Sequence, residues 1–279
     1  PEQRQQAYSQ GLEPCALQLY DETPQVLMRY FINLLYKGTA YSGWQTQPDA
    51  PTVQETIERA LTLVSRSPEP ISIVGAGRTD AGVHARAMVA HVDLNLSPEE
   101  AEELRFRTDR YLPHDIALRS IVPVSEDAHA RFSATARTYR YYLTTKKNPF
   151  AEEQMLRMHF DLDFESMNAA AAQLMAYSDF TSFSKLHTDV KTNNCRVTEA
   201  YWQPGAHDGE WVFTITADRF LRNMVRAIVG TLLQVGKGRL SPEDFAAIIE
   251  SKDRGRAAAS APAHALYLEH VAYPPSIYL

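Results

Sequence analysis

The amino-acid sequence predicts an α+β fold. Strand-like segments with alternating apolar side chains are numerous, and a few amphipathic stretches with helical spacing lie between them. The chain has 279 residues, enough for one large domain or two moderate ones. Its 44% hydrophobic and 22% charged residues are typical of a globular protein.

The first half of the chain is expected to alternate strands with two helices. Residues 29–36 are apolar on both faces, as in a strand covered on both sides. Thr52 and Glu55 have the spacing of a capping box before an amphipathic helix. Ser97 and Glu100, with Pro98 between them, predict a second helix start. Strands are expected at 71–74, at 87–94 and through 121–122.

The second half is expected to pair strands with three helices. A strand over 138–143 places Tyr139, Tyr141 and Leu143 on one face. The polar stretch 185–196 is expected on the surface. The remaining predicted elements are a helix over 164–177, strands over 197–202 and 211–217, a helix from Phe220 to Val235 ended by Gly236, a helix from Ser241 to Lys252, and a strand from Ala265 to Tyr273.

Composition excludes several classes of protein. The longest apolar run is too short to cross a membrane, and no secretory leader is visible. Cys15 and Cys195 are too few for a disulfide framework or a zinc site, which favours the cytoplasm. The nine histidines lack metal-ligand spacing, so no metal is expected. Residues 1–27 are Gln-rich and aperiodic, and we expect an N-terminal extension there, disordered or artefactual.

Charge is distributed unevenly along the chain. The net charge of −6 argues against indiscriminate nucleic-acid binding. Residues 105–147, however, hold nine Lys and Arg against four Asp and Glu, with aromatic residues among them. Such runs are usually solvated surface, but cations interleaved with aromatics also suit phosphate contacts and base stacking.

The glycine-rich segment 74–85 is the main candidate for chemistry. It presents Asp80 two residues after Arg78, between two apolar runs, as a turn joining buried strands would. It has neither the third glycine of a dinucleotide fingerprint nor the Lys-Ser/Thr of a P-loop. Spacing alone leaves two interpretations open: a catalytic carboxylate, or an ordinary surface Arg–Asp pair.

Several motifs resemble those of the tRNA pseudouridine synthase A family, in the family's order, across roughly residues 30 to 273. The most specific is the run GRTDAGVHA at 77–85. The others are the Tyr- and Gly-rich loop 36–45, HARFSATARTYRY at 129–141, DFTSF at 179–183, and FLRNMVRAIVG at 220–230. The chain departs from the family pattern at 109–116, which lacks asparagines, and at Ala265, where glycine is usual.

The resemblance implies a pseudouridine synthase fold. That fold has a mixed, mostly antiparallel central sheet flanked by helices, and two α+β halves with the active cleft between them. The first half would span residues 28–127 and carry the Asp80 loop. The second would span 128–279 and carry the strand of Tyr139 and the helix of Arg226.

The resemblance also implies an activity, which is isomerisation of uridine to pseudouridine at positions 38, 39 and 40 of the tRNA anticodon stem-loop. Asp80 would be the catalytic carboxylate, Arg226 its ion-pair partner, and Tyr139 the ring against the base. No cofactor is implied, and the family generally acts as a homodimer. The residues expected to bind substrate are Arg78 beside Asp80, Leu266 in the uracil pocket, and Arg131, Arg137, Arg140 and Arg222 on the RNA backbone.

Two other functions compete with this one. A tRNA-binding protein without catalysis would keep the basic aromatic surface but would not need Asp80, Tyr139 and Arg226 together. A carboxylate-dependent hydrolase should show a second acid near the first. Asp80 is the only acid within 74–90, which disfavours a hydrolase.

Overall fold

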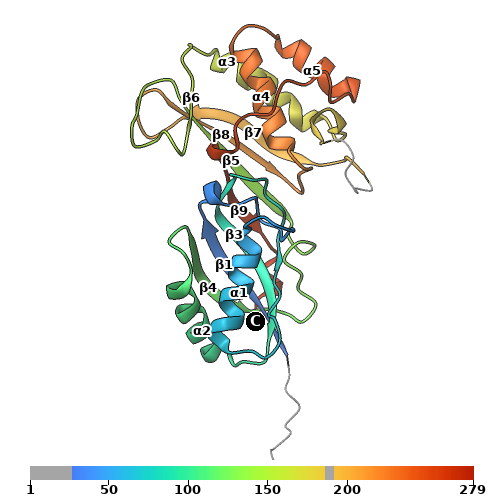
Figure 1. The fold of residues 1–279 in the computed structure, drawn as a ribbon. Helices are drawn as coiled ribbons and strands as arrows, with labels where there is room; N and C mark the ends of the chain where they lie inside the picture. Colours follow the sequence, from blue (N-terminus) through green and yellow to red (C-terminus); the bar gives the residue numbers. More distant parts are fainter. Residues whose placement is uncertain (1–26, 186–191) are drawn as a thin grey trace, which may run out of the picture.

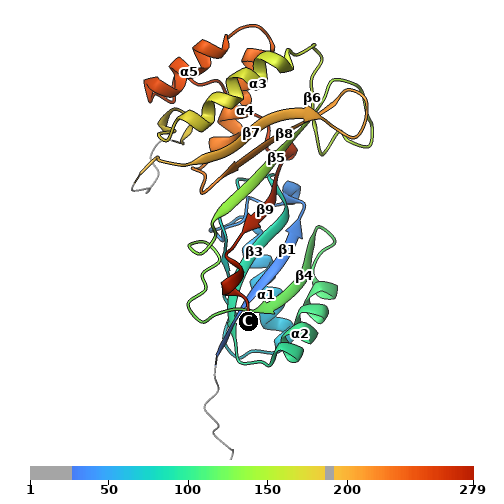
Figure 2. The same cartoon turned by 180° about the vertical axis from the view of Figure 1, so that it is seen from behind.

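The computed structural model describes residues 27–185 and 192–279. Nearly all of the predicted extension at 1–27 lies outside these ranges, as does part of the predicted surface stretch at 185–196. The molecule is elongated, with one group of helices on each of two stacked lobes (Figure 1). Seen from behind, the strands of the lower lobe lie in front of its helices (Figure 2). Helices therefore cover one face of that part of the sheet.

One nine-stranded sheet runs through both lobes. Its main path is ordered β4-β1-β3-β9-β5-β8-β7, with β2 paired to β3 and β6 paired to β5. Among the strand pairs of the described residues, only β3–β9 and β5–β6 are parallel. The predicted α+β fold with a mixed, mostly antiparallel sheet is confirmed. The strands are β1 (Met28–Tyr36), β2 (Val74–Gly75), β3 (His84–Leu94), β4 (Ile116–Pro123), β5 (Ala136–Thr144), β6 (Leu156–Arg157), β7 (Val197–Pro204), β8 (Glu210–Ala217) and β9 (Leu266–Ala272).

The described part of the chain has five α-helices flanking the sheet, and four of them begin after a residue whose side chain caps the helix. At Ser97 and Ser241 both halves of a capping box are formed. At Thr52 the hydroxyl accepts the N–H of Glu55, which is the first half of the predicted box. The helices are α1 (Val53–Ser65), α2 (Pro98–Tyr111), α3 (Phe164–Ala172), α4 (Met224–Gly236) and α5 (Pro242–Ser251). The predicted helix over 164–177 is shorter, since α3 passes into a 3₁₀ turn at Gln173–Ala176.

The predicted start of α4 at Phe220 is wrong, for a backbone reason, whereas its predicted end near Val235 agrees with the structure to within one residue. Asn223 adopts a left-handed conformation with φ 67°, so the helix begins at Met224 and Arg222 lies in the turn before it. At the other end Gly236 is still helical. The left-handed residue is Gly238, whose N–H donates to the carbonyl of Val235.

The sheet is shared by two hydrophobic cores that meet at β9. The first core contains β1, α1 and most of β3, and the second contains α3, α4 and β8. Leu266 of β9 packs in the second core, whereas Leu268 and Val271 pack in the first. The division at 127/128 stays a prediction, because residues late in the chain return to complete the first core.

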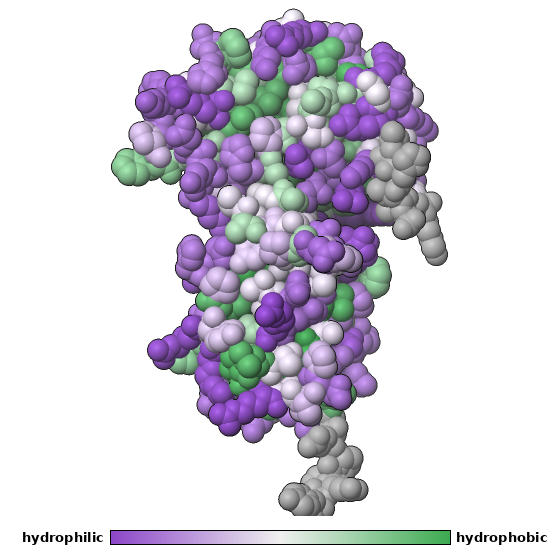
Figure 3. Space-filling view, in the orientation of Figure 1, coloured by the Kyte–Doolittle hydropathy of each residue, from purple (hydrophilic) through white to green (hydrophobic). Residues whose placement is uncertain are grey.

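The join between the lobes depends on few backbone contacts on its β3 side. There β3 and β9 pair only at His84–Tyr267 and Ala85–Leu268. Arg86 of β3 reinforces this join, since its Nη1 lies 3.0 Å from the Glu269 carboxylate. The Tyr142 hydroxyl of β5 donates to the same carboxylate at 2.7 Å. The space-filling view shows a narrower waist at this level, with pale residues of intermediate hydropathy (Figure 3).

Gly43 lies where two loops touch. A Cβ at this position would be 2.4 Å from the carbonyl oxygen of Thr79, and φ is +99°. Residues other than glycine are strained at such a positive φ, because their Cβ clashes with the backbone. By contrast, a Cβ at Gly77 would meet no heavy atom within 4 Å.

We therefore predict that Gly43→Ala lowers the free energy of unfolding by about 2 kcal/mol or more, since it combines a clash with an unfavourable φ. Gly77→Ala is the matched control and should change it by less than about 1 kcal/mol. Denaturant titration followed by circular dichroism measures both. Equal losses in the two variants would contradict the argument.

His91 is buried on β3, 7% exposed, and its Nδ1 accepts the N–H of Ala130 at 3.1 Å. Burial lowers the pKa of His91 to about 4, and the neighbouring His129 adds to the shift. The unfolded chain takes up this proton near pH 6.5, whereas the folded chain resists until about pH 4. Stability linked to His91 is therefore present above pH 6.5 and falls as the pH drops toward 4.

We predict that His91→Gln reduces the loss of unfolding free energy between pH 7 and pH 5. The exposed His114 provides the control, because His114→Gln should leave that loss as in the parent chain. Urea titrations at the two pH values give the difference directly. An unchanged pH dependence in His91→Gln would refute the assignment.

Candidate active site

Asp80 begins a tight turn between β2 and β3. The N–H of Val83 donates to the Asp80 carbonyl at 3.1 Å, which closes the turn. Gly82 occupies the position with φ +78°, where a residue without Cβ is favoured. The Asp80 side chain keeps 24% of its surface exposed, so it is accessible while its backbone is fixed.

Side chains and backbone of the loop 36–45 brace the Asp80 turn. The buried hydroxyls of Tyr36 and Thr79 lie 2.8 Å apart. The Thr79 carbonyl accepts the N–H of Trp44 at 3.3 Å, and the Tyr41 carbonyl accepts the N–H of Gly82 at 3.3 Å. This fixes the residues on both sides of Asp80.

Two arginines of the upper lobe face the Asp80 carboxylate. Arg226 on α4 places Nη1 3.4 Å from Oδ2, and its Nε donates to the Ala261 carbonyl at 2.8 Å. Arg222, in the turn before α4, places Nε 3.9 Å from Oδ1. Both distances are long for hydrogen bonds, so the attraction is mainly electrostatic. The two predicted arginines are brought together although only Arg226 is helical.

Tyr139 lies near Asp80 on β5. Burial is the main reason why the pKa of Tyr139 is raised to about 12; the Arg137 charge opposes this rise, and the smaller effect of the Asp80 charge adds to it. The phenol is therefore protonated at neutral pH and can donate a hydrogen bond. The ring of Phe220 packs against Tyr139 edge to face, with 5.1 Å between centroids.

The other predicted substrate-binding residues are spread around this centre. Arg78 is exposed, and the ion pairs found at Asp80 in the described chain are those with Arg222 and Arg226. Leu266 is buried in β9 opposite Tyr141. Arg131 is exposed beside Phe132, and Arg140 lies on the face of β5 opposite Tyr139.

Arg137 is used within the protein. Its Nη1 donates to the carbonyls of Ala134 at 3.1 Å and Asp218 at 2.8 Å. Its Nη2 donates to the carbonyls of Ala76 at 3.0 Å and Arg131 at 2.5 Å. All four terminal N–H groups are thus engaged, and a phosphate would have to displace one of these carbonyls. Its contact with RNA stays a prediction.

Sequence reasoning missed the residues that hold the site. Tyr36, Trp44 and Phe220 were visible only as aromatics in motifs, with no pattern to assign their partners. Their contacts join segments far apart in the chain, as when Trp44 packs where a Cβ of Gly75 would be. Such contacts follow from the fold and not from local spacing.

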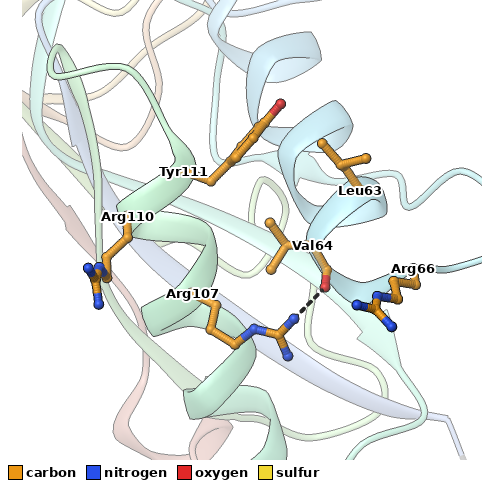
Figure 4. A pocket seen from close by; sticks show the side chains of 6 residues that line it. All are labelled: Leu63, Val64, Arg66, Arg107, Arg110 and Tyr111. Carbon is orange, nitrogen blue, oxygen red and sulfur yellow. Dashed lines mark hydrogen bonds between the residues drawn. The ribbon is translucent and has the colours of Figure 1, made fainter.

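A shallow surface hollow lies apart from Asp80. About 410 Å³ in size, it lies between the ends of α1 and α2, where Arg107 donates to the Val64 carbonyl at 3.0 Å (Figure 4). The 13-residue α1 separates it from the loop beside Asp80 by about 20 Å. It is lined by Leu63, Val64, Arg66, Arg107, Arg110 and Tyr111 and contains no acid.

Neither a candidate metal site nor a membrane-spanning helix lies within residues 27–185 and 192–279. No three His, Cys, Asp or Glu side chains gather there closely enough to hold a metal ion. None of the helices in the same ranges is both long and apolar enough to cross a membrane.

Comparison with known proteins agrees with the geometry. A family model described as tRNA pseudouridine synthase matches residues 33–133 and 170–274. These ranges include the Asp80 turn, Arg226 and all of β9. A solved structure of a dye-decolorizing protein from V. cholerae overlaps with a TM-score of only 0.20 at 10% identity, which carries no argument.

Three similar curated proteins share the description tRNA pseudouridine synthase A. The tRNA pseudouridine synthase A of Porphyromonas gingivalis is 63% identical over 91% of this chain and 100% of its own length. That of Parabacteroides distasonis is 56% identical over 90% and 98%, and that of Bacillus subtilis 40% over 88% and 99%. The chain therefore belongs to the tRNA pseudouridine synthase A family and is a tRNA pseudouridine synthase, an isomerase.

Proposed function

We propose that this isomerase acts on uridines 38, 39 and 40 in the anticodon stem-loop of tRNA, with Asp80 as its catalytic carboxylate. The observation that carries the proposal is the placement of Asp80 on a braced turn, facing Arg226 at 3.4 Å. Family membership supports the substrate, and the predicted motif positions support the residue.

The reaction exchanges one bond for another within the substrate. The N1–C1′ bond of uridine breaks, the uracil turns, and a C5–C1′ bond forms. C5 loses its proton and N1 gains one, so atoms and electrons balance without an added reactant. The protein must supply a carboxylate at the ribose, a partner that stabilises its charge, and a pocket that retains the detached base.

The described side chains can divide these tasks. Asp80 acts at the ribose, as nucleophile or base, while Arg226 and Arg222 offset its negative charge. Tyr139, with a pKa near 12, lies against the base as a protonated phenol. Leu266 contributes apolar surface that excludes water. The uridine must leave its stack to reach Asp80, so a flipping step is required.

The proposal also includes further RNA contacts, a homodimer and a location in the cytoplasm. The exposed Arg78 and Arg131 are positioned for RNA contacts outside the carboxylate. We expect a homodimer with tRNA lying across both copies, working in the cytoplasm. In a net-acidic chain such an assembly would collect basic residues on one face.

Asp80→Asn keeps the shape of the side chain and removes its charge. We predict that pseudouridine formation in unmodified tRNA falls at least about 1,000-fold while tRNA binding persists, because the reacting group is lost and the RNA contacts remain. The exposed Asp127 supplies the control variant Asp127→Asn, with unchanged activity. If Asp80→Asn formed pseudouridine at a near-parental rate, Asp80 would not be the catalytic carboxylate, and only the proposal of tRNA binding would stand.

Arg226→Met removes the closer of the two cations and leaves a partly buried Asp80 less compensated. We predict that kcat falls about 100-fold with a much smaller change in KM, since Arg226 touches the carboxylate rather than the RNA backbone. Single-turnover kinetics separate the two effects. Arg59→Met, an exposed arginine on α1, should match the parent enzyme. A change confined to KM would assign Arg226 to binding instead.

A further inference from the structure

An exposed phenylalanine lies on the loop 129–135, directly before β5. The Phe132 ring is 76% exposed, whereas most large apolar side chains of the described chain are buried. A single exposed apolar residue needs no explanation by itself. The surroundings of Phe132 do, because they hold the ring in one place.

The loop is fixed by hydrogen bonds from its own residues. The N–H of His129 donates to the Ser133 hydroxyl, and the N–H of Ser133 donates to the His129 carbonyl, both at 2.9 Å. The Nδ1 atom of the His129 ring accepts the N–H groups of Arg131 at 3.1 Å and Phe132 at 3.3 Å. The N–H groups of Arg131, Phe132 and Ser133 therefore all have partners within the protein.

Contacts from the core hold the same loop. Ala130 donates its N–H to the buried His91, and its carbonyl accepts the Tyr273 hydroxyl at 2.6 Å. Arg137 binds the carbonyl of Arg131 and, with the same Nη2, that of Ala76 in the segment leading to Asp80. One guanidinium thus ties the Phe132 loop to the catalytic loop.

The rings form a column that starts in the core and ends in solvent. His91 and His129 have centroids 4.6 Å apart, and His129 and Phe132 4.3 Å apart. The Arg131 guanidinium lies 5.6 Å from the centre of the Phe132 ring. A fixed aromatic ring with a cation beside it matches the chemistry of an unpaired base and its phosphate.

The column lies on the working face of the sheet. Arg137 and Tyr139 are two residues apart on β5 and pair with β8 in regular register, so their side chains share a face. Two residues of strand span about 7 Å. Because Arg137 binds both the Arg131 carbonyl of the Phe132 loop and the Ala76 carbonyl before Asp80, an RNA that holds a uridine at Tyr139 and Asp80 would pass close to the Phe132 loop.

We propose that Phe132 is a stacking platform for an unpaired base of the tRNA anticodon arm near the target uridine, with Arg131 contacting the adjoining phosphate. This rests on the proposed function, because it takes the same RNA to lie across the Asp80 site. The preformed ring costs little ordering on binding, so its contribution appears as affinity.

The test uses the full chain and a synthetic, unmodified anticodon stem-loop. Phe132→Ala should weaken binding about tenfold and leave the single-turnover rate at saturation nearly unchanged. Phe132→Trp should restore affinity, and its emission should be quenched by stacking as RNA is added. The matched controls are Phe150→Ala and Phe150→Trp, since Phe150 is 94% exposed on a different segment.

Parental affinity in Phe132→Ala would overturn the platform, and so would equal quenching at positions 132 and 150. Failure of the wild-type chain to form pseudouridine is a separate result that sinks the proposed function, because binding and quenching are measured without turnover. Product formed at the parental KM by Phe132→Ala sinks only the platform. Melting curves of the variants that match the curve of the parent chain would show that the substitutions leave the protein folded.

Discussion

The electrostatic contact between Asp80 and Arg226 depends on how the two halves of the sheet are joined. Asp80 belongs to a turn of the lower lobe and Arg226 to a helix of the upper lobe, and their atoms approach to 3.4 Å. A shift of 1 Å between the lobes would weaken the field at the carboxylate and misplace it for reaction. The narrow β3–β9 pairing and its Arg86–Glu269–Tyr142 cluster therefore matter to chemistry as well as to stability.

Rigidity around the carboxylate comes from backbone polar groups that find protein partners. The Thr79 carbonyl, the Ala76 carbonyl and the N–H of Gly82 are each bound by a residue from another segment. Loops with satisfied backbone groups lose little further freedom when a substrate arrives. The site thus resembles a scaffold built before the RNA binds, with the exposed arginines left free to adjust.

Local sequence signals predicted most of the fold, and they failed where the backbone departed from its usual conformation. The serine caps at Ser97 and Ser241 worked because the signal and its consequence lie within four residues. The start of α4 could not be predicted, since a left-handed Asn223 is permitted but not required by its neighbours. The arrangement of Asp80 and Arg226 came from family likeness, as residues 146 positions apart carry no spacing signal. The four carbonyls on Arg137 were equally hidden, because an arginine on a strand next to tyrosines has the same pattern whether it meets RNA or backbone.

The position of β9 has a consequence for how the molecule is assembled. This strand is the last in sequence, yet it lies in the middle of the sheet, between β3 and β5. A chain emerging from the ribosome can pair β1 with β3 and form the β7–β8 hairpin, but it cannot unite the two parts of the sheet until residues 266–272 are available. Contacts between residues so far apart in sequence make folding slow. The active site is therefore completed only in the last step of folding. A partly synthesised or truncated chain would thus hold Asp80 without its arginine partner, and could not modify RNA prematurely.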